Sequence, residues 1–260
     1  MNTDDALSEA VTGYALSMQR LCAATPAGST ERAGHVRLLF SGTALPSLNS
    51  VAVLDDEWEA GDVTALAEHA EGLGLPWSIL FRVARDTANE SRLAEIAEIA
   101  GSHGLTGRSE TPFLTCDRDD LVGRGPRVDS RIVTAGAADW AEYTAALSDG
   151  FEAPPSAFGS LMAGGVLDVP EFTGYLARLD GQPAATGLGS RIGRSLGVFN
   201  IAVVPRFRRA GLGRAVTERV VLDGFEAGAT IAYLQASDDG RPLYESMGFR
   251  HVETWISFRG

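Results

Sequence analysis

Residues 200–214 read Asn200-Ile-Ala-Val-Val-Pro-Arg-Phe-Arg-Arg-Ala-Gly-Leu-Gly-Arg214, and this stretch decides the fold. An apolar run ends at Pro205, and Arg208-x-x-Gly211-x-Gly213 then opens a segment with helical periodicity. Glycines let a ligand approach the backbone closely, and the first turn of a helix carries N–H groups without intrahelical partners. These donors and the positive end of the helix dipole favour an anion such as a phosphate. The stretch therefore predicts a strand that leads into a pyrophosphate-binding helix.

Charge is distributed unevenly around this motif. Five arginines fall within residues 206–219, and Glu218 is the one acidic residue among them. The whole chain, in contrast, has a net charge of −12. An acidic surface argues against a nucleic acid partner, because such binding depends on neutralising phosphates. It is compatible with a cationic substrate such as an amine.

Length and composition indicate a globular protein. The chain has 260 residues, of which 45% are hydrophobic, enough for one large or two small domains. No apolar run approaches the roughly 18 residues of a membrane-spanning helix. The acidic N-terminus lacks the features of a signal peptide, so we expect a cytoplasmic protein without membrane partners. The spacing of Cys22, Cys116 and the four histidines suggests neither a disulfide nor a metal site.

Hydrophobic periodicity and turn residues predict alternating strands and helices. In the second half we expect helices over 137–148, 156–163, 212–227 and 239–247, with strands over 131–134, 175–179, 183–189, 196–204, 230–236 and 249–258. Asp180-Gly181 marks a tight hairpin turn. In the first half we expect helices over 3–22, 63–72 and 91–103, with strands over 35–40, 48–54, 77–84 and 109–116.

The two halves resemble each other in sequence. Residues 48–53 are similar to residues 199–204, with Asn49 matching Asn200, and each run precedes a helix, a strand, a second helix and a last strand. The first copy has four carboxylates within residues 55–61, where the second has its arginines and paired glycines. Carboxylates repel a pyrophosphate, so we expect only the second copy to bind the anion.

Two motifs together identify a family. Arg208-Arg-Ala-Gly211-Leu-Gly213 resembles the R/Q-x-x-G-x-G/A motif of the GNAT superfamily of N-acetyltransferases. The segment from Ser237 to Phe249 contains Leu-Tyr244-Glu-Ser-Met-Gly248-Phe249, which is similar to the second common pattern of that family. The resemblance covers about residues 128–260, and the N-terminal part resembles a degenerate partial GNAT repeat.

The resemblance implies a cofactor site. In the family, the strand that matches residues 199–204 is splayed from the next strand, and its backbone groups bind the pantetheine arm of coenzyme A. Ile201, Ala202 and Val203 would have this role here. The backbone N–H groups of the following loop would bind the pyrophosphate, which assigns to the cofactor Arg208, Arg209, Ala210, Gly211, Leu212, Gly213 and Arg214.

The resemblance also assigns a catalytic residue. Tyr244 takes the position at which many members of the family keep a tyrosine that protonates the leaving thiolate. The base that deprotonates the amine stays open between Glu152, Glu171, Asp238, Glu245 and a water molecule. Ser237 and Asp239 are candidates for capping the helix that follows them.

Other nucleotide-binding folds fit the sequence less well. The third glycine of a dinucleotide-binding motif would fall at Val216, and too little chain follows for a doubly wound sheet. A P-loop would need a Gly-Lys-Ser/Thr sequence, and the chain contains no lysine.

The sequence therefore predicts an α+β, three-layer GNAT fold, with a mixed and mostly antiparallel sheet flanked by helices. We expect two related domains in tandem: a degenerate domain over 1–120, a linker over 121–128 and a catalytic domain over 129–260. The predicted function is transfer of acetyl from acetyl-CoA, without a metal, to a small amine or peptide acceptor in a ternary complex. A non-catalytic acyl-CoA sensor is the alternative, and either a monomer or a homodimer is expected.

Overall fold

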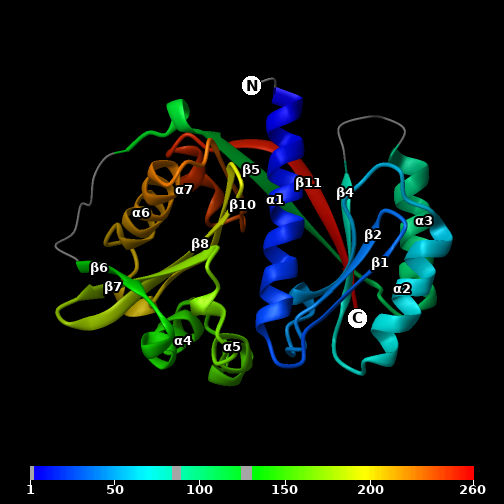
Figure 1. Cartoon of the computed structure of the whole chain (residues 1–260), viewed down its shortest axis with the longest axis horizontal. Coiled ribbons are helices and arrows are strands. Elements are labelled where there is room, and N and C mark those ends of the chain that lie inside the picture. The colour runs from blue at the N-terminus through cyan, green and yellow to red at the C-terminus, as the bar shows by residue number, and fades with distance from the viewer. Residues whose placement is uncertain (1–2, 84–88, 124–130) are drawn as a thin grey trace. The chain divides into compact units, whose positions relative to one another are not determined.

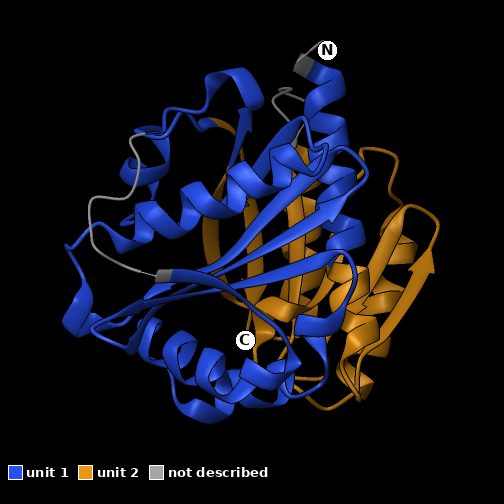
Figure 2. Ribbon diagram, turned by 60° about the vertical axis from the view of Figure 1, so that its left-hand side comes forward, with its two compact units in different colours: residues 1–17, 114–250 blue, residues 18–113, 251–260 orange. Residues whose placement is uncertain are grey.

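The computed structural model of the chain describes residues 3–83, 89–123 and 131–260. It divides into two compact units (Figure 2). Unit 1 consists of residues 1–17 and 114–250, and unit 2 consists of residues 18–113 and 251–260. Each unit is therefore assembled from two separate stretches of the chain. The expected linker lies largely outside the described residues, and the expected boundaries remain a prediction.

Unit 1 contains a sheet with the strand order β5–β10–β9–β8–β7–β6 (Figure 1). The β6, β7, β8 and β9 strands pair antiparallel in sequence order, whereas β9 and β10 pair parallel. The strands are β6 (Arg131–Ala135), β7 (Phe172–Leu179), β8 (Gln182–Ile192), β9 (Ser195–Val203), β10 (Ile231–Gln235) and the end of β5 (Gly107–Asp117). The helices are the first part of α1 (Thr3–Ala24), then α4 (Trp140–Gly150), α5 (Pro155–Met162), α6 (Leu212–Glu226) and α7 (Arg241–Glu245).

Helices cover both faces of this sheet. In Figure 2, α6 lies on one face and α4 with α5 on the other. The predicted stripe of α6 is buried in the core, as the exposures of Leu212, Val216, Val220 and Phe225 show. Gly187 of β8 allows this contact, because an added β-carbon would lie 2.6 Å from Val216. Burial of this stripe supplies the hydrophobic stabilisation that holds α6 on the sheet.

The predicted hairpin between β7 and β8 is present. Asp180 and Gly181 both have positive φ, 51° and 75°, which is the conformation of a two-residue type I′ turn. The expected helix over 239–247 is shorter than predicted. It begins at Arg241 with Pro242 in its first turn, and it ends at Glu245.

Unit 2 contains strands in the order β1–β2–β3–β4–β11–β5. These are β1 (Ser29–Ala33), β2 (Val36–Phe40), β3 (Asn49–Val53), β4 (Ser78–Val83), β11 (Arg250–Arg259) and the first part of β5, with helices α2 (Ala60–Gly72) and α3 (Asn89–Ser102). The segment of β1 was not among the expected strands. Its exposed, polar residues gave no alternating pattern, and pairing with β2 makes it a strand.

The two halves of the chain share an order of elements. The run β3-α2-β4-α3-β5 has the same sequence of strands and helices as β9-α6-β10-α7-β11. In both runs the first two strands pair parallel. The α+β class and the mixed, mostly antiparallel pairing are thus confirmed, whereas a common origin of the two runs remains a prediction. None of the helices in the described ranges has both the length and the apolar character needed to cross a membrane.

Candidate functional site

The first turn of α6 is arranged as an anion site. Gly211 precedes the helix with φ = 84°, a left-handed conformation that favours glycine. The N–H of Ala215 donates to the carbonyl of Gly211 (3.1 Å), which is the first hydrogen bond of the helix. The N–H groups of Leu212 and Gly213 lie ahead of this bond and have no acceptor within the helix. With the helix dipole, they form a site that suits a phosphate.

The fold itself does not require glycine at position 213. Gly213 lies within the helix, so its backbone conformation does not require glycine. An added β-carbon would be 3.5 Å from Leu243 and 3.6 Å from Val203, which is ordinary van der Waals contact. Neither the backbone nor these neighbours therefore demand glycine at this position. A larger side chain would extend toward the space between Val203 and Leu243, at the start of the helix.

The strand before this loop separates from its parallel neighbour. The pairing of β9 with β10 ends at Gly197 and Tyr233, although β9 continues to Val203. The N–H of Val204 donates to the carbonyl of Ala184 (2.9 Å), so this N–H points toward β8. The backbone of Val203 therefore points away from β8, by the alternation of an antiparallel pair. Ile201, Ala202 and Val203, the predicted pantetheine contacts, all lie in this separated part.

A bulge lies within the same part of β9. The register shifts between Thr186 and Leu188, so that Gly187 faces both Asn200 and Ile201. Asn200 has φ = 53°, and its carbonyl accepts a hydrogen bond from the hydroxyl of Thr186 (2.9 Å). The carbonyl of Gly187 accepts one from the buried hydroxyl of Tyr143 (3.0 Å). Both carbonyls at the bulge are thereby held by side chains of unit 1.

The arginines of the loop have different partners. Arg208 is bound to the chain itself: it donates to the carbonyls of Val203 (3.3 Å) and Gly150 (2.9 Å) and forms an ion pair with Glu152 (2.5 Å). Arg209 is exposed, with φ = 66°, and Ala210 follows it. The Arg214 guanidinium reaches Ser246, just beyond α7. The structure thus places all of the predicted loop residues around one helix terminus.

Tyr244 lies in α7 with its ring edge-on to Phe249, at 6.0 Å between ring centroids. Burial raises the pKa of its hydroxyl to about 12. The hydroxyl is therefore neutral at physiological pH and can donate a proton. No hydrogen bond links it to another residue in the part of the chain that the structure describes.

The candidate bases differ in their surroundings. Glu152 and Glu245 each form an ion pair with an arginine, Arg208 and Arg241 respectively. Asp238 is exposed. Glu171 lines a cavity of about 200 Å³ beside the C-terminal half of α6, away from its first turn. None of the four stands out as the base on these contacts.

Ser237 and Asn49 have structural roles, but the N-cap of α7 is Gly240 and no side chain among the described residues caps the helix, so neither Ser237 nor Asp239 is the N-cap that was expected. The hydroxyl of Ser237 accepts a hydrogen bond from the N–H of Gly240 (3.2 Å), one residue before α7. The amide of Asn49 binds its own loop, because its oxygen accepts from the N–H of Ser41 (3.0 Å) and its nitrogen donates to Thr43 (2.7 Å).

Backbone strain gathers around the same loop. Four non-glycine residues have positive φ in the described ranges: Glu152, Asp180, Asn200 and Arg209. Asp180 forms a hairpin turn, where this conformation is expected. The other three lie in the turn that contacts Arg208, in the bulge of β9 and in the loop before α6. Such residues cluster at functional sites because the surrounding structure must hold them there.

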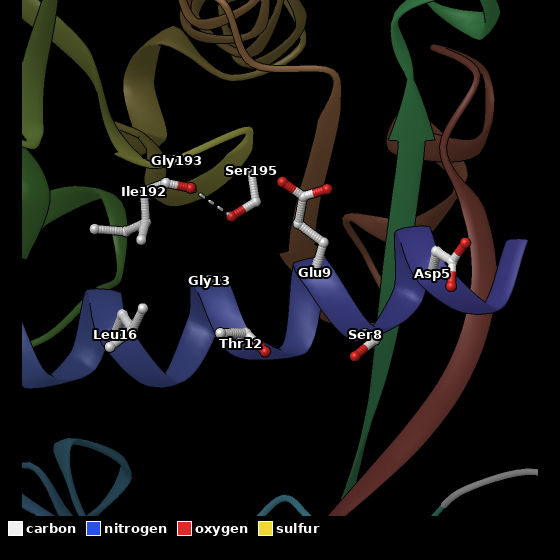
Figure 3. Close-up of a pocket in the computed structure, with 9 residues that line it drawn as sticks. All are labelled: Asp5, Ser8, Glu9, Thr12, Gly13, Leu16, Ile192, Gly193 and Ser195. Atoms are coloured by element: carbon white, nitrogen blue, oxygen red, sulfur yellow. Dashed lines mark hydrogen bonds between the residues drawn. The ribbon is translucent and has the colours of Figure 1, made fainter. Parts of the chain in front are cut away.

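A larger cavity lies elsewhere in unit 1. An open pocket of about 430 Å³ lies between α1 and the turn that joins β8 to β9, with Asp5, Glu9 and Ser195 in its lining (Figure 3). The hydroxyl of Ser195 donates to the carbonyl of Ile192 (3.0 Å). At about 3.3 Å per residue, Ser195 stands roughly 26 Å along β9 from Val203. This cavity is thus separate from the terminus of α6.

In unit 2, the end of β3 and the turn before α2 are hydrogen-bonded to other residues of the same unit. The pairing of β3 with β4 continues to Val53, at the end of β3. The Arg82 guanidinium donates to the carbonyl of Leu54 (3.3 Å), and Arg92 donates to the carbonyls of Asp56 (2.5 Å) and Trp58 (3.0 Å). The turn before α2 is therefore fixed by arginines from within unit 2.

Sequence reasoning did not reveal the contacts of the turn after α4. Glu152 was expected only as a candidate base, and Tyr143 was not among the expected site residues. A turn that follows a helix carries no sequence signal for the strand it packs against. The described residues contain no group of three or more His, Cys, Asp or Glu side chains placed to bind a metal.

Several solved structures are similar to this chain. A GCN5-related N-acetyltransferase from Kribbella flavida is 21% identical, with 96% of this chain and 95% of that chain covered and a TM-score of 0.69. A functionally unknown conserved protein from Staphylococcus epidermidis is 13% identical, with 88% and 92% covered and a TM-score of 0.60. A GCN5-related N-acetyltransferase from Sphaerobacter thermophilus is 16% identical, with 81% and 72% covered and a TM-score of 0.56.

At these identities the likeness concerns the fold. No curated protein sequence matches the chain. Residues 170–251, which include β9, the loop, α6 and α7, match the model of the acetyltransferase (GNAT) domain. The chain therefore contains an acetyltransferase domain of the GNAT family.

Proposed function

We propose that this protein transfers the acetyl group of acetyl-CoA to an amine, by direct attack in a ternary complex. The observation that carries the proposal is the separation of β9 from β10 beside the first turn of α6. A strand segment that is no longer paired with β10 and a helix terminus that suits phosphate are adjacent in the chain. Together they match the two ends of coenzyme A, an extended arm with amide groups and a pyrophosphate.

The loop and α6 would bind the pyrophosphate. The N–H groups of Leu212 and Gly213 supply donors, and Gly211 sets the direction of the chain. The Arg208 side chain is already bonded to Val203, Gly150 and Glu152. We therefore assign the binding of phosphate to the backbone of this loop rather than to the Arg208 guanidinium.

The edge of β9 would orient the thioester. The amine nitrogen attacks the acetyl carbon, the C–S bond breaks, and the coenzyme A thiolate leaves. Holding both reactants in one geometry replaces a bimolecular encounter by a step within a complex. A backbone donor aimed at the developing oxyanion is commonly worth about 10²–10³ in rate.

Tyr244 would protonate the leaving thiolate. Its hydroxyl is neutral at physiological pH, as that of any tyrosine is, and burial raises its pKa further to about 12. A general acid typically contributes about 10²–10⁴ in rate. The attacking amine loses its own proton to water or to a nearby carboxylate, which balances the proton that Tyr244 later recovers.

Two measurements test this function. Isothermal calorimetry with coenzyme A measures binding, and release of free thiol from acetyl-CoA measures transfer to a panel of alkyl, aryl and polyamine acceptors. We expect micromolar binding and turnover of at least one amine. Failure to bind coenzyme A would overturn the cofactor site. Binding without turnover of any amine, alcohol or peptide would indicate an acyl-CoA sensor instead.

A further inference from the structure

The turn after α4 has an unusual residue at its left-handed position. The N–H of Ala153 donates to the carbonyl of Ser148 (2.9 Å), and the N–H of Glu152 donates to that of Asp149 (3.1 Å). This pair of bonds is the Schellman motif, and its left-handed residue is usually glycine. Here that residue is Glu152, with φ = 54°. A glutamate at this position strains the backbone, and the surrounding contacts must hold it there.

The side chain of Glu152 binds the loop before α6. Its carboxylate forms an ion pair with Arg208 (2.5 Å). The same guanidinium donates to the carbonyls of Gly150 (2.9 Å) and Val203 (3.3 Å). One arginine therefore connects three segments: the turn after α4, the edge of β9 and the start of the loop that would hold the pyrophosphate.

The turn is also packed directly on β9. A β-carbon on Gly150 would lie 2.7 Å from that of Ala202 and 3.1 Å from the nitrogen of Val203. The next residue, Phe151, is 51% exposed and lies against Phe158, with 5.5 Å between ring centroids. Because Gly150 packs against β9, the position of this turn relative to β9 also determines the position of the exposed ring of Phe151.

We propose that Glu152 is a positioning residue. It couples the binding of a ligand at the loop before α6 to the order of the turn after α4, residues 150–153. A phosphate bound at the first turn of α6 fixes the backbone of the loop. Because Arg208 belongs to that loop and is bonded to Gly150 and Glu152, the turn becomes more ordered as well. The identity of the ligand rests on the proposed function, whereas the coupling rests on the contacts of Arg208.

The test compares two glycine variants. Glu152→Gly removes the carboxylate and relieves the strained backbone. Asp180→Gly is the matched control, since it also replaces an acidic residue of positive φ (51°), but in the hairpin between β7 and β8. Both variants should fold, with melting temperatures within about 3 °C of the parent protein.

Hydrogen exchange of the N–H groups of Phe151, Glu152 and Ala153 is then measured with and without coenzyme A. In the parent and in Asp180→Gly, saturating coenzyme A should slow their exchange by about threefold or more. In Glu152→Gly the same addition should slow exchange clearly less than in the parent, because only the bond from Arg208 to the carbonyl of Gly150 then connects the loop to the turn. The affinity for coenzyme A itself should stay within about threefold, because an exposed ion pair contributes little.

Steady-state kinetics provides a second readout. With the amine that the panel finds to be turned over fastest, Glu152→Gly should lower kcat/KM for that amine by about tenfold, while Asp180→Gly leaves it unchanged. Equal protection by coenzyme A in the parent and in Glu152→Gly would overturn the coupling. A parent protein that does not bind coenzyme A would instead overturn the proposed function.

Discussion

The hydroxyl of Tyr233 lies 2.6 Å from the place that a β-carbon on Gly197 would occupy. Gly197 and Tyr233 form the last pair between β9 and β10. The two strands therefore separate directly after the residue pair in which the tyrosine side chain packs over the glycine. The ring of Phe199 approaches the same place at 2.4 Å. Two aromatic side chains thus fill the space beside Gly197 at the fork of the strands.

Substitution of Gly197 by alanine should therefore destabilise the protein. Insertion of a methyl group into filled space commonly costs about 1–3 kcal/mol, because side chains or backbone must move. Urea denaturation followed by circular dichroism would measure the free energy of unfolding. Gly159→Ala in α5, where an added β-carbon meets nothing within 4 Å, is the control and should be neutral or stabilising. Equal stability of the two variants would contradict this account of the fork.

Substitution of Gly213 by glutamate should abolish binding of coenzyme A and leave the fold intact. The space around Gly213 accepts a side chain, but a carboxylate at the first turn of α6 repels a phosphate. We expect a loss of about 100-fold or more in affinity by calorimetry, with an unchanged circular dichroism spectrum. Gly61→Glu is a matched control, since Gly61 is the second residue of α2 and has no neighbour within 4 Å of an added β-carbon. Unchanged binding by Gly213→Glu would remove this helix terminus from the cofactor site.

Replacement of Tyr244 by phenylalanine should slow turnover at least about tenfold. The affinity for acetyl-CoA should change little, because the variant keeps the ring that packs against Phe249. Thiol release under saturating acetyl-CoA measures the rate, and calorimetry with coenzyme A measures the affinity. A variant with the turnover of the parent would exclude Tyr244 as the proton donor.

The two cysteines should be unreactive in the folded protein. Burial raises the pKa of both Cys22 and Cys116 to about 12, so almost no thiolate exists at pH 8. Since the folded-state pKa exceeds the unfolded value, the associated stability is present at neutral pH and declines as the pH rises from about 9 toward 12. A chromogenic disulfide reagent at pH 8 should label neither thiol in buffer and both in concentrated urea. Rapid labelling of the native protein would show that one of these sites opens.

A fragment of residues 129–260 should not fold by itself. Unit 1 also needs residues 1–17 and 114–117, whereas the last strand of the fragment, residues 251–260, belongs to unit 2. We expect a fragment without a cooperative thermal transition by circular dichroism. A fragment that unfolds cooperatively and binds coenzyme A would show that the domain boundary expected from the sequence is correct.

Local patterns in the sequence predicted the elements of unit 1 well. Asp180-Gly181 specifies its own turn, and the apolar stripe of α6 follows from the spacing of Leu212, Val216 and Val220. The glycine-rich loop and the start of α6 could likewise be predicted from the sequence, because left-handed backbone and helix initiation depend on neighbouring residues. These features are encoded within a few positions of the chain.

Other features depend on residues that are distant in sequence. The division into units is interleaved along the chain, and no local pattern in residues 107–117 or 250–259 indicates the strand with which each pairs. The contact of Arg208 with Glu152 was also hidden, because a glutamate at a left-handed position gives no signal. Only the fold brings the end of α4 to the loop before α6.

The turn before α2 has a consequence for stoichiometry. Its carbonyls at Leu54, Asp56 and Trp58 are already bonded to Arg82 and Arg92, and β3 stays paired with β4 to its end. Within the described residues, β9 separates from its parallel neighbour beside the start of α6, whereas β3 and the turn before α2 are bonded within unit 2. We therefore expect coenzyme A to saturate the protein at one molecule per chain, without a second binding site in unit 2.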